Sequence, residues 1–210
     1  MVTQKGRLIV TMEQDLLKEV ANISTGYAAT ALSTLLQRQV AMNVPEIALH
    51  EMEDLPRLSG YHHEVCATVH APIAGDVEGT MFFLTSMDTA VRLVNMVLPN
   101  VVNDLDVQAY PLASSAFQEI GNIVIGSYVT AIGSLTSLTL YPLVTELTID
   151  IGSAVLAEAT YQLVEVDQFF LMETAMRVKN EEEGMEGFLL FIPNERAVSV
   201  LKRALERDRP

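Results

Sequence analysis

The chain contains two copies of one segment, spaced 100 residues apart. Residues 19–49 align without a gap to residues 119–149, and a later block at 77–84 resembles residues 185–192. Identical positions in the first alignment include Glu19/Glu119, Asn22/Asn122, Ile23/Ile123, Gly26/Gly126, Thr30/Thr130, Ala31/Ala131, Leu35/Leu135 and Glu46/Glu146. Two copies are too few for a solenoid. The repeat therefore predicts an α+β domain with pseudo-twofold symmetry, in which each copy covers the apolar face of the other.

Each copy is expected to form a helix, three strands and a closing helix. The opening helix is predicted from apolar residues at three- and four-residue steps: Leu16, Val20, Ile23, Tyr27, Ala31 and Leu35. The other first-copy elements are strands at 40–49, 63–73 and 75–86, and a helix near 88–98. Pro45 is expected at an edge or bulge of its strand, and Asp88 is expected to cap the last helix.

The second copy adds an expected helix at 153–163, a segment rich in Ala, Leu and Glu. Its strands at 169–178 and 187–192 are joined by an acidic turn at 179–184, interpreted as a solvated hairpin tip, and a helix at 194–206 follows. The predicted fold is a single domain over residues 1–210, with repeat 1 at about 10–100 and repeat 2 at about 108–207. We expect an antiparallel sheet of about six strands, with the two long motif helices on one face.

Composition and charge limit the classes of partner. Half of the residues are hydrophobic and 19% are charged, which supports a sizeable core. The formal net charge of −14 repels phosphate backbones, so no nucleic-acid partner is expected. The single cysteine, Cys66, cannot form an internal disulfide and is compatible with a reducing compartment. No run approaches the roughly 18 apolar residues that span a membrane, so we expect a cytoplasmic protein without membrane insertion.

The repeated polar residues form a stripe on each motif helix. At about 100° per residue, the four positions of each copy fall within an arc of roughly 60°: Asp15, Glu19, Asn22 and Gly26, and Ser115, Glu119, Asn122 and Gly126. A solvated helix face is one interpretation. However, Asn is a poor helix former and Gly costs about 1 kcal/mol inside a helix. Their presence at matched positions in two diverged copies favours a contact with another protein, whose backbone a glycine lets approach closely.

A second polar cluster offers possible metal ligands: His62, His63, Cys66 and His70. The alternation of Val65, Ala67 and Val69 instead indicates a strand, on which Cys66 and His70 share one face while His63 points to the other. We predict that this cluster binds no metal, and elemental analysis of the purified protein should therefore detect no stoichiometric zinc. The chain also lacks nucleophile-elbow, phosphate-loop and dinucleotide-binding motifs, so any chemistry must depend on positioning.

The repeated motif resembles the signature of a known protein family. Asp15-x3-Glu19-x2-Asn22 followed by Pro45, with a second copy at Ser115-x3-Glu119-x2-Asn122, resembles the signature of the CheC/CheX/FliY family of chemotaxis phosphatases. The flanking segments are also similar, and the resemblance covers nearly the whole chain. Two motif copies in about 210 residues are more similar to the CheC type than to FliY or to the single-motif CheX.

The resemblance implies hydrolysis of the aspartyl phosphate on the response regulator CheY. It implies that Asn22 and Asn122 orient the attacking water, and that Glu19 and Glu119 pair with a lysine of CheY. The divalent metal is expected on CheY, so the chain needs no cofactor of its own. The remaining motif positions are expected to contact the partner: Asp15, Gly26, Pro45, Ser115 and Gly126. The receptor deamidase CheD is a further partner that the resemblance implies.

Each copy departs somewhere from the family pattern. The family usually has Gly before the Asn, which Gly121 keeps and Ala21 does not, and Thr145 stands where the first copy has Pro45. The first copy is slightly favoured as the more complete site. Two hypotheses stay open: a phosphatase acting on phosphorylated CheY, or a non-catalytic module that docks CheD or a flagellar switch component.

Overall fold

The computed structural model describes residues 4–44, 47–51, 54–55, 63–99, 110–161 and 168–207. In the first copy the elements are α1 (Gln4–Leu36), β1 (Val40–Asn43), β2 (Ile47–Glu51), β3 (Val65–Gly75), β4 (Gly79–Ser86) and α3 (Met87–Val97). In the second they are α4 (Pro111–Thr136), β5 (Leu140–Pro142), β6 (Glu146–Ile151), α5 (Gly152–Tyr161), β7 (Gln168–Val178), β8 (Met185–Pro193) and α6 (Glu195–Arg207). The predicted extra helix is thus present as α5.

The strands of both copies form a single antiparallel sheet. Its order is β1-β7-β8-β4-β3-β5, with β2 also paired to β7 and β6 to β3. Strands β1 to β4 of the first copy correspond in turn to β5 to β8 of the second. When each strand is exchanged for its counterpart, the same strand order is obtained in reverse, as expected for pseudo-twofold symmetry. The predicted α+β class and antiparallel sheet are confirmed. Within the described residues the sheet has eight strands rather than about six, because the first strand of each copy is divided in two.

Each of these edge strands is divided where its register on the neighbouring strand changes by one residue. In the second copy Pro142 pairs with Ile73 and Glu146 pairs with His70, so three residues, 143–145, stand opposite two. The register of β1 and β2 on β7 shifts in the same way, from Asn43–Ala175 to Ile47–Met172. An extra residue on one strand is the mark of a β-bulge. Pro45 itself lies outside the described residues, but the shift occurs where a bulge was predicted.

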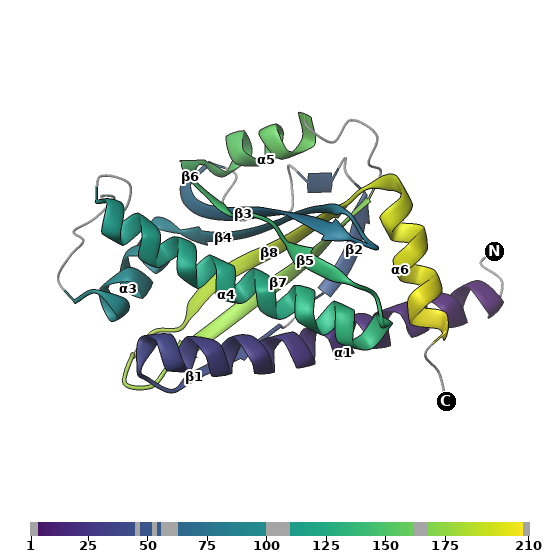
Figure 1. Cartoon of the computed structure of the whole chain (residues 1–210), viewed down its shortest axis with the longest axis horizontal. Coiled ribbons are helices and arrows are strands. Elements are labelled where there is room, and N and C mark those ends of the chain that lie inside the picture. The colour runs from purple at the N-terminus through teal and green to yellow at the C-terminus, as the bar shows by residue number, and fades with distance from the viewer. Residues whose placement is uncertain are drawn as a thin grey trace.

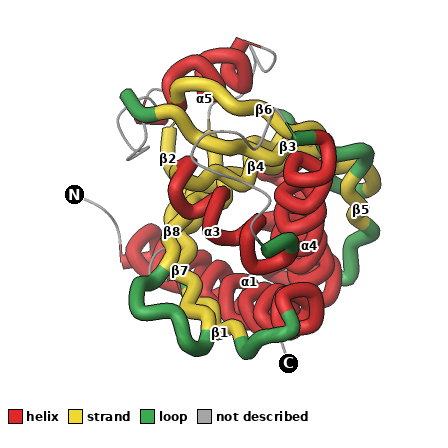
Figure 2. Tube along the Cα trace, turned by 90° about the vertical axis from the view of Figure 1, so that its left-hand side faces the viewer, coloured by secondary structure: helices red, strands yellow, loops and turns green. Residues whose placement is uncertain are grey.

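The two motif helices lie side by side on one face of the sheet, as predicted (Figure 1). Helices α3 and α6 contribute Leu93 and Leu201 to the same main core, while α5 packs over the opposite face (Figure 2). Beneath α5 lies a smaller apolar cluster that includes Cys66, Phe82 and Phe169. Among the described helices, none is long and apolar enough to cross a membrane.

The inward face of α1 differs from the predicted apolar stripe. Tyr27, a member of the predicted stripe, is 46% exposed, whereas Ser24 and Thr25 are buried. Their hydroxyls donate to the carbonyls of Val20 and Ala21, so burying them leaves no unpaired donor. Small residues therefore form much of the α1 face that packs inward, and a pattern based on large apolar residues misplaces it.

Two local details qualify the predictions. Asp88 is not the N-cap of α3, because Ser86 holds that position and its hydroxyl accepts from the Thr89 amide. The acidic turn after β7 does join a hairpin. Its carboxylates are partly paired with the first copy, since Glu181 lies 2.7 Å from Arg38 and Glu183 lies 3.6 Å from Arg92.

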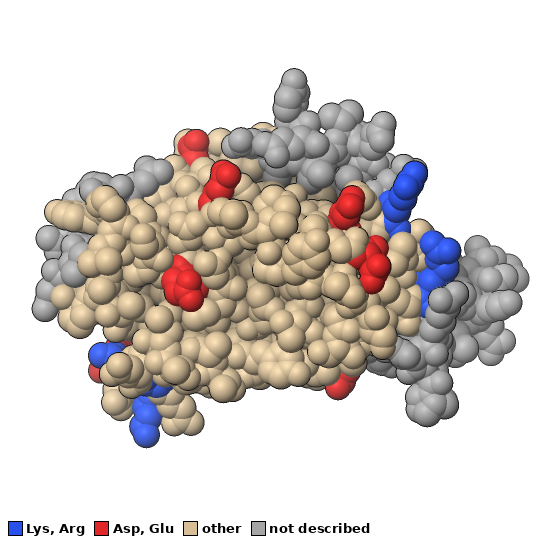
Figure 3. Space-filling view, in the orientation of Figure 1, with Lys and Arg blue, Asp and Glu red and all other residues tan. Residues whose placement is uncertain are grey.

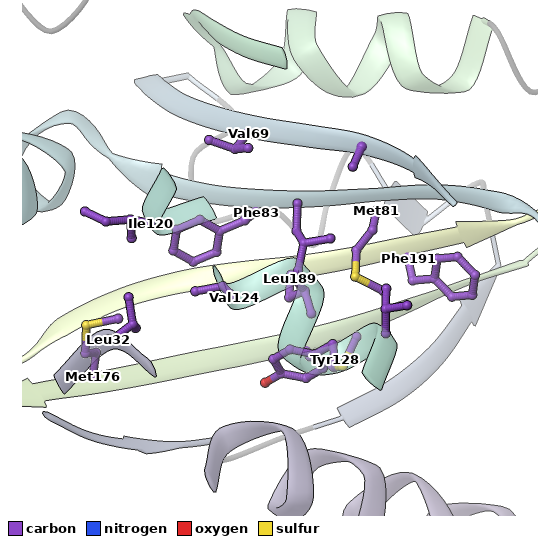
Figure 4. Close-up of a cluster of buried hydrophobic side chains, with 14 of the residues drawn as sticks. Leu32, Val69, Met81, Phe83, Ile120, Val124, Tyr128, Met176, Leu189 and Phe191 are labelled. Carbon is purple, nitrogen blue, oxygen red and sulfur yellow. The ribbon is translucent and has the colours of Figure 1, made fainter. Parts of the chain in front are cut away.

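The main core fills the space between the sheet and the motif helices. Side chains from strands and helices interleave there, including Val69 and Phe83 from the sheet and Ile120, Val124 and Tyr128 from α4 (Figure 4). Phe83 stacks on Phe117 with ring centroids 6.3 Å apart. This packing fixes the position and rotation of α4 on the sheet, and it therefore determines which side of α4 faces outward.

One hydroxyl in this core leads to a stability prediction. The Tyr128 hydroxyl is buried near Ser24, has no hydrogen-bond partner among the described residues, and has its pKa raised by that burial. An unsatisfied buried group is costly, so Tyr128→Phe should leave the free energy of unfolding unchanged or raise it by up to about 1 kcal/mol. Urea denaturation measures this difference. A loss of more than about 1 kcal/mol would mean that the hydroxyl is satisfied, either by the nearby Ser24 hydroxyl or by an ordered water.

Candidate functional site

The polar stripe of α1 faces outward. Glu19, Asn22 and Gly26 are all exposed, as is Lys18, which immediately precedes the motif glutamate. Asp15 lies within α1, but its side chain is outside the described residues. The first copy therefore presents a carboxylate and a carboxamide one helical turn apart, ready to contact another molecule.

The α4 stripe has the same arrangement. Ser115, Glu119 and Asn122 are exposed, and Gly126 is partly exposed. The Asn122 amide Nδ2 donates to Glu119 Oε2 at 3.3 Å, and Ser115 Oγ donates to the Pro111 carbonyl at 2.9 Å. The first of these contacts shows that the motif spacing brings amide and carboxylate into direct contact on the helix surface.

The two repeated glycines have open surroundings. A Cβ added at Gly26 or Gly126 would meet nothing within 4 Å. Packing within the chain therefore does not require either glycine, although each lowers helix stability. This observation supports the interpretation that a partner approaches both stripes closely.

Gly121 has a different role. A Cβ at this position would lie 2.5 Å from the Val69 Cβ and 2.6 Å from both of its methyl carbons. The glycine thus lets α4 approach β3 closely at the residue that precedes Asn122. The corresponding first-copy residue, Ala21, is itself buried at 4% exposure, so the fold accommodates a methyl group there. The departure from the family pattern at Ala21 therefore changes the packing beneath α1 and leaves the exposed stripe unchanged.

A loop that the motif spacing does not indicate lies beside the second stripe. The Gln118 side-chain amide donates to Thr145, both to its carbonyl and, at 3.0 Å, to its hydroxyl. This ties the bulge between β5 and β6 to α4, where it leaves Leu143 49% and Val144 83% exposed. The repeat alignment could have indicated the loop, because Thr145 aligns with Pro45 and Gln118 with Lys18.

The histidine and cysteine cluster does not form a common site in the described structure. Cys66 is buried in the apolar cluster under α5, and that burial raises the pKa of its thiol. His70 shares the Cys66 face of β3, as predicted, but its ring stacks on Phe82 with ring centroids 5.6 Å apart. His63 is exposed and His62 lies outside the described residues. No group of three potential ligands occurs among the described residues.

The two stripes bring together few kinds of chemical group. Each supplies a carboxylate, which can pair with a cation, and a carboxamide, which can both donate to and accept from a water molecule. The face that carries both helices is mostly uncharged, with scattered acidic groups, while Lys and Arg lie toward its ends (Figure 3). Such a surface can position a water against a reactive group only if another molecule provides that group.

Comparisons with known proteins agree with this description. The sequence model of the CheC-like family matches residues 12–49 and 112–144, which include both stripes. The CheY-P phosphatase CheC of Bacillus subtilis is 31% identical over 184 residues, covering 87% of this chain and 88% of that protein.

Solved structures share the fold. The crystal structure of Thermotoga maritima FliY superimposes with a TM-score of 0.74 at 17% identity, covering 94% of this chain and 97% of that one. A chain of the CheX-CheY-BeF3-Mg+2 complex from Borrelia burgdorferi matches with a TM-score of 0.53 at 15% identity, covering 83% of this chain and 98% of that one. At these identities the likeness is one of architecture.

Proposed function

Because this chain belongs to the CheC-like family, we propose that it hydrolyses the aspartyl phosphate of the chemotaxis response regulator CheY. The observation that carries the proposal is the likeness, over most of both chains, to a CheY-P phosphatase. The outward position of the Glu and Asn side chains in both copies supports it, because a phosphatase acting on another protein must present its working groups at the surface.

In the proposed reaction, each Asn holds the water that attacks the phosphorus atom. The water oxygen forms the new P–O bond while the bond to the aspartyl oxygen breaks, and the water proton passes to solvent. Transfer of a phosphoryl group needs mainly alignment and charge stabilisation, so one amide that fixes the water in line can have a large effect. The divalent metal that offsets the phosphate charge belongs to CheY.

The motif glutamates are proposed to hold CheY in register. A carboxylate one helical turn from the Asn can pair with a lysine of CheY and so aim the amide at the phosphate. In the free chain Glu119 accepts from Asn122 at 3.3 Å. We infer that pairing with a CheY lysine would replace this contact and release the amide for the water.

The competing proposal is a non-catalytic module that docks CheD or a flagellar switch component. It arose from the departures at Ala21 and Thr145. The first is accommodated in the core, and the second occupies a bulge with the same register shift as the Pro45 region. Neither departure removes an exposed Glu or Asn from its stripe, so neither supports the non-catalytic module over the enzyme, and CheD is proposed as an additional partner of the active enzyme.

The test is phosphate release from phosphorylated CheY present in large excess over the purified chain. We expect many turnovers per molecule, at a rate above the spontaneous loss of phosphate from CheY. The same assay with CheD added reports whether CheD binds and alters turnover. If phosphate loss is not accelerated with or without CheD, while CheD binds in a pull-down, the module proposal replaces the enzymatic one.

A further inference from the structure

The second motif is surrounded by exposed apolar side chains. Leu143 and Val144 stand on the bulge loop with 49% and 83% of their surface exposed, and Leu112 on α4 is 60% exposed. Isolated exposed apolar residues are ordinary on protein surfaces, but a group beside a functional motif is typical of a contact surface. We call Leu112, Leu143 and Val144 the apolar rim of the second site.

The rim is held next to the motif by contacts within the chain. Gln118 bonds to Thr145 and precedes Asn122 by four residues, so the two side chains are neighbours on α4. The loop therefore flanks the Asn122 side of the stripe. Leu112 precedes Glu119 by seven residues, which places it two turns away on the same face. A molecule seated over Glu119 and Asn122 would meet the rim on two sides.

The described part of the corresponding first-copy loop does not present this apolar surface. Its counterparts of Leu143 and Val144 are Asn43, which is polar, and Val44, which packs against the main core. The counterpart of Gln118 is the exposed Lys18. The reactive pair thus occurs in both copies, while among the described neighbours the second copy exposes Leu143 and Val144 and the first copy has Asn43 and Lys18 beside its stripe.

Charge identifies the kind of partner that fits. The segment from 111 to 161 contains no Lys or Arg, while Glu119, Glu146 and Asp150 are exposed acids within it. A partner for this surface should bring a cation to Glu119 and apolar side chains to the rim. Near Glu19 the Lys18 ammonium would repel such a cation and weaken the pairing.

We propose that the apolar rim is a docking surface for CheY, and that it makes the α4 site bind CheY more tightly than the α1 site. The inference rests on the proposed function and adds to it an asymmetry between the sites. Both Asn residues orient water, but the two sites differ in KM rather than in the chemical step. This asymmetry runs opposite to the completeness of the motif, which slightly favours the first copy.

The test uses two backgrounds in which one site acts alone. Asn22→Ala leaves the second site, and Asn122→Ala leaves the first. Into each we introduce Leu143→Ser with Val144→Ser and measure kcat and KM for phosphorylated CheY. In the Asn22→Ala background KM should rise about tenfold, equivalent to about 1.4 kcal/mol, with little change in kcat. In the Asn122→Ala background, which serves as the matched control, KM should change less than twofold.

Several outcomes would overturn the docking inference. One is an unchanged KM in the Asn22→Ala background, and another is a fall in kcat alone, which would mean that the loop positions Asn122. A third is weaker CheD binding by the serine variants with KM unchanged, which would assign the rim to CheD. Circular dichroism checks that the serine variants fold. Failure of the proposed function is distinguishable, because the parent chain itself would then release no phosphate from CheY.

Discussion

Replacing both Asn22 and Asn122 with alanine is expected to lower CheY dephosphorylation by at least about 10²-fold. Removing one well-placed orienting group typically costs 10²- to 10³-fold at its own site, equivalent to about 2.7–4 kcal/mol of transition-state stabilisation. Each single variant should keep the activity of the other site, since the two stripes lie on different helices. Measured rates of the single variants then report how the total activity is divided.

Because both Asn side chains are exposed, these substitutions separate an effect on activity from an effect on stability. Asn22 and Asn122 project from the outer faces of α1 and α4, so their truncation should change stability by no more than about 0.5 kcal/mol. Ser134→Ala is a suitable control because it removes an exposed polar group from the same α4 helix, away from the stripe. Full turnover in the double variant would rule out the water-positioning mechanism, even if the chain proves to be a phosphatase.

Gly121→Ala is expected to destabilise the fold by about 2 kcal/mol. The added methyl would lie 2.5–2.6 Å from three carbon atoms of Val69, so α4 or β3 must shift. Gly126→Ala is the matched control on the same helix, because its methyl meets nothing within 4 Å. That variant should instead gain about 0.5–1 kcal/mol from the better helix propensity of alanine. Urea denaturation of the two variants measures both effects.

A second substitution, at Val69, tests whether contact with this residue causes the loss of stability. In the Gly121→Ala background, Val69→Ala makes room for the new methyl and should recover part of the lost stability. Since the two residues are in contact, their effects should be non-additive by more than about 0.5 kcal/mol. If Gly121→Ala proves as stabilising as Gly126→Ala, the close approach of α4 to β3 is wrong.

The sequence alone was sufficient for features that depend on local periodicity. The repeat and its apolar patterns predicted the order of elements, the antiparallel sheet and the shared face of the motif helices. Helical spacing also placed Glu19 and Asn22 on one stripe, and Glu119 and Asn122 on another. These inferences succeeded because a helix imposes its geometry on residues three and four apart wherever it lies.

Only the tertiary structure decided the features that depend on contacts between residues far apart in the sequence. The inward face of α1 could not be read from apolar residues, because small hydroxyl side chains such as Ser24 bond their own helix and can be buried. Gly121 is explained only by Val69 in the other copy, and the apolar rim only by the bond from Gln118 to Thr145, 27 residues away. Periodicity indicates which residues share a face, but the neighbours that meet that face are set by how the two copies pack together.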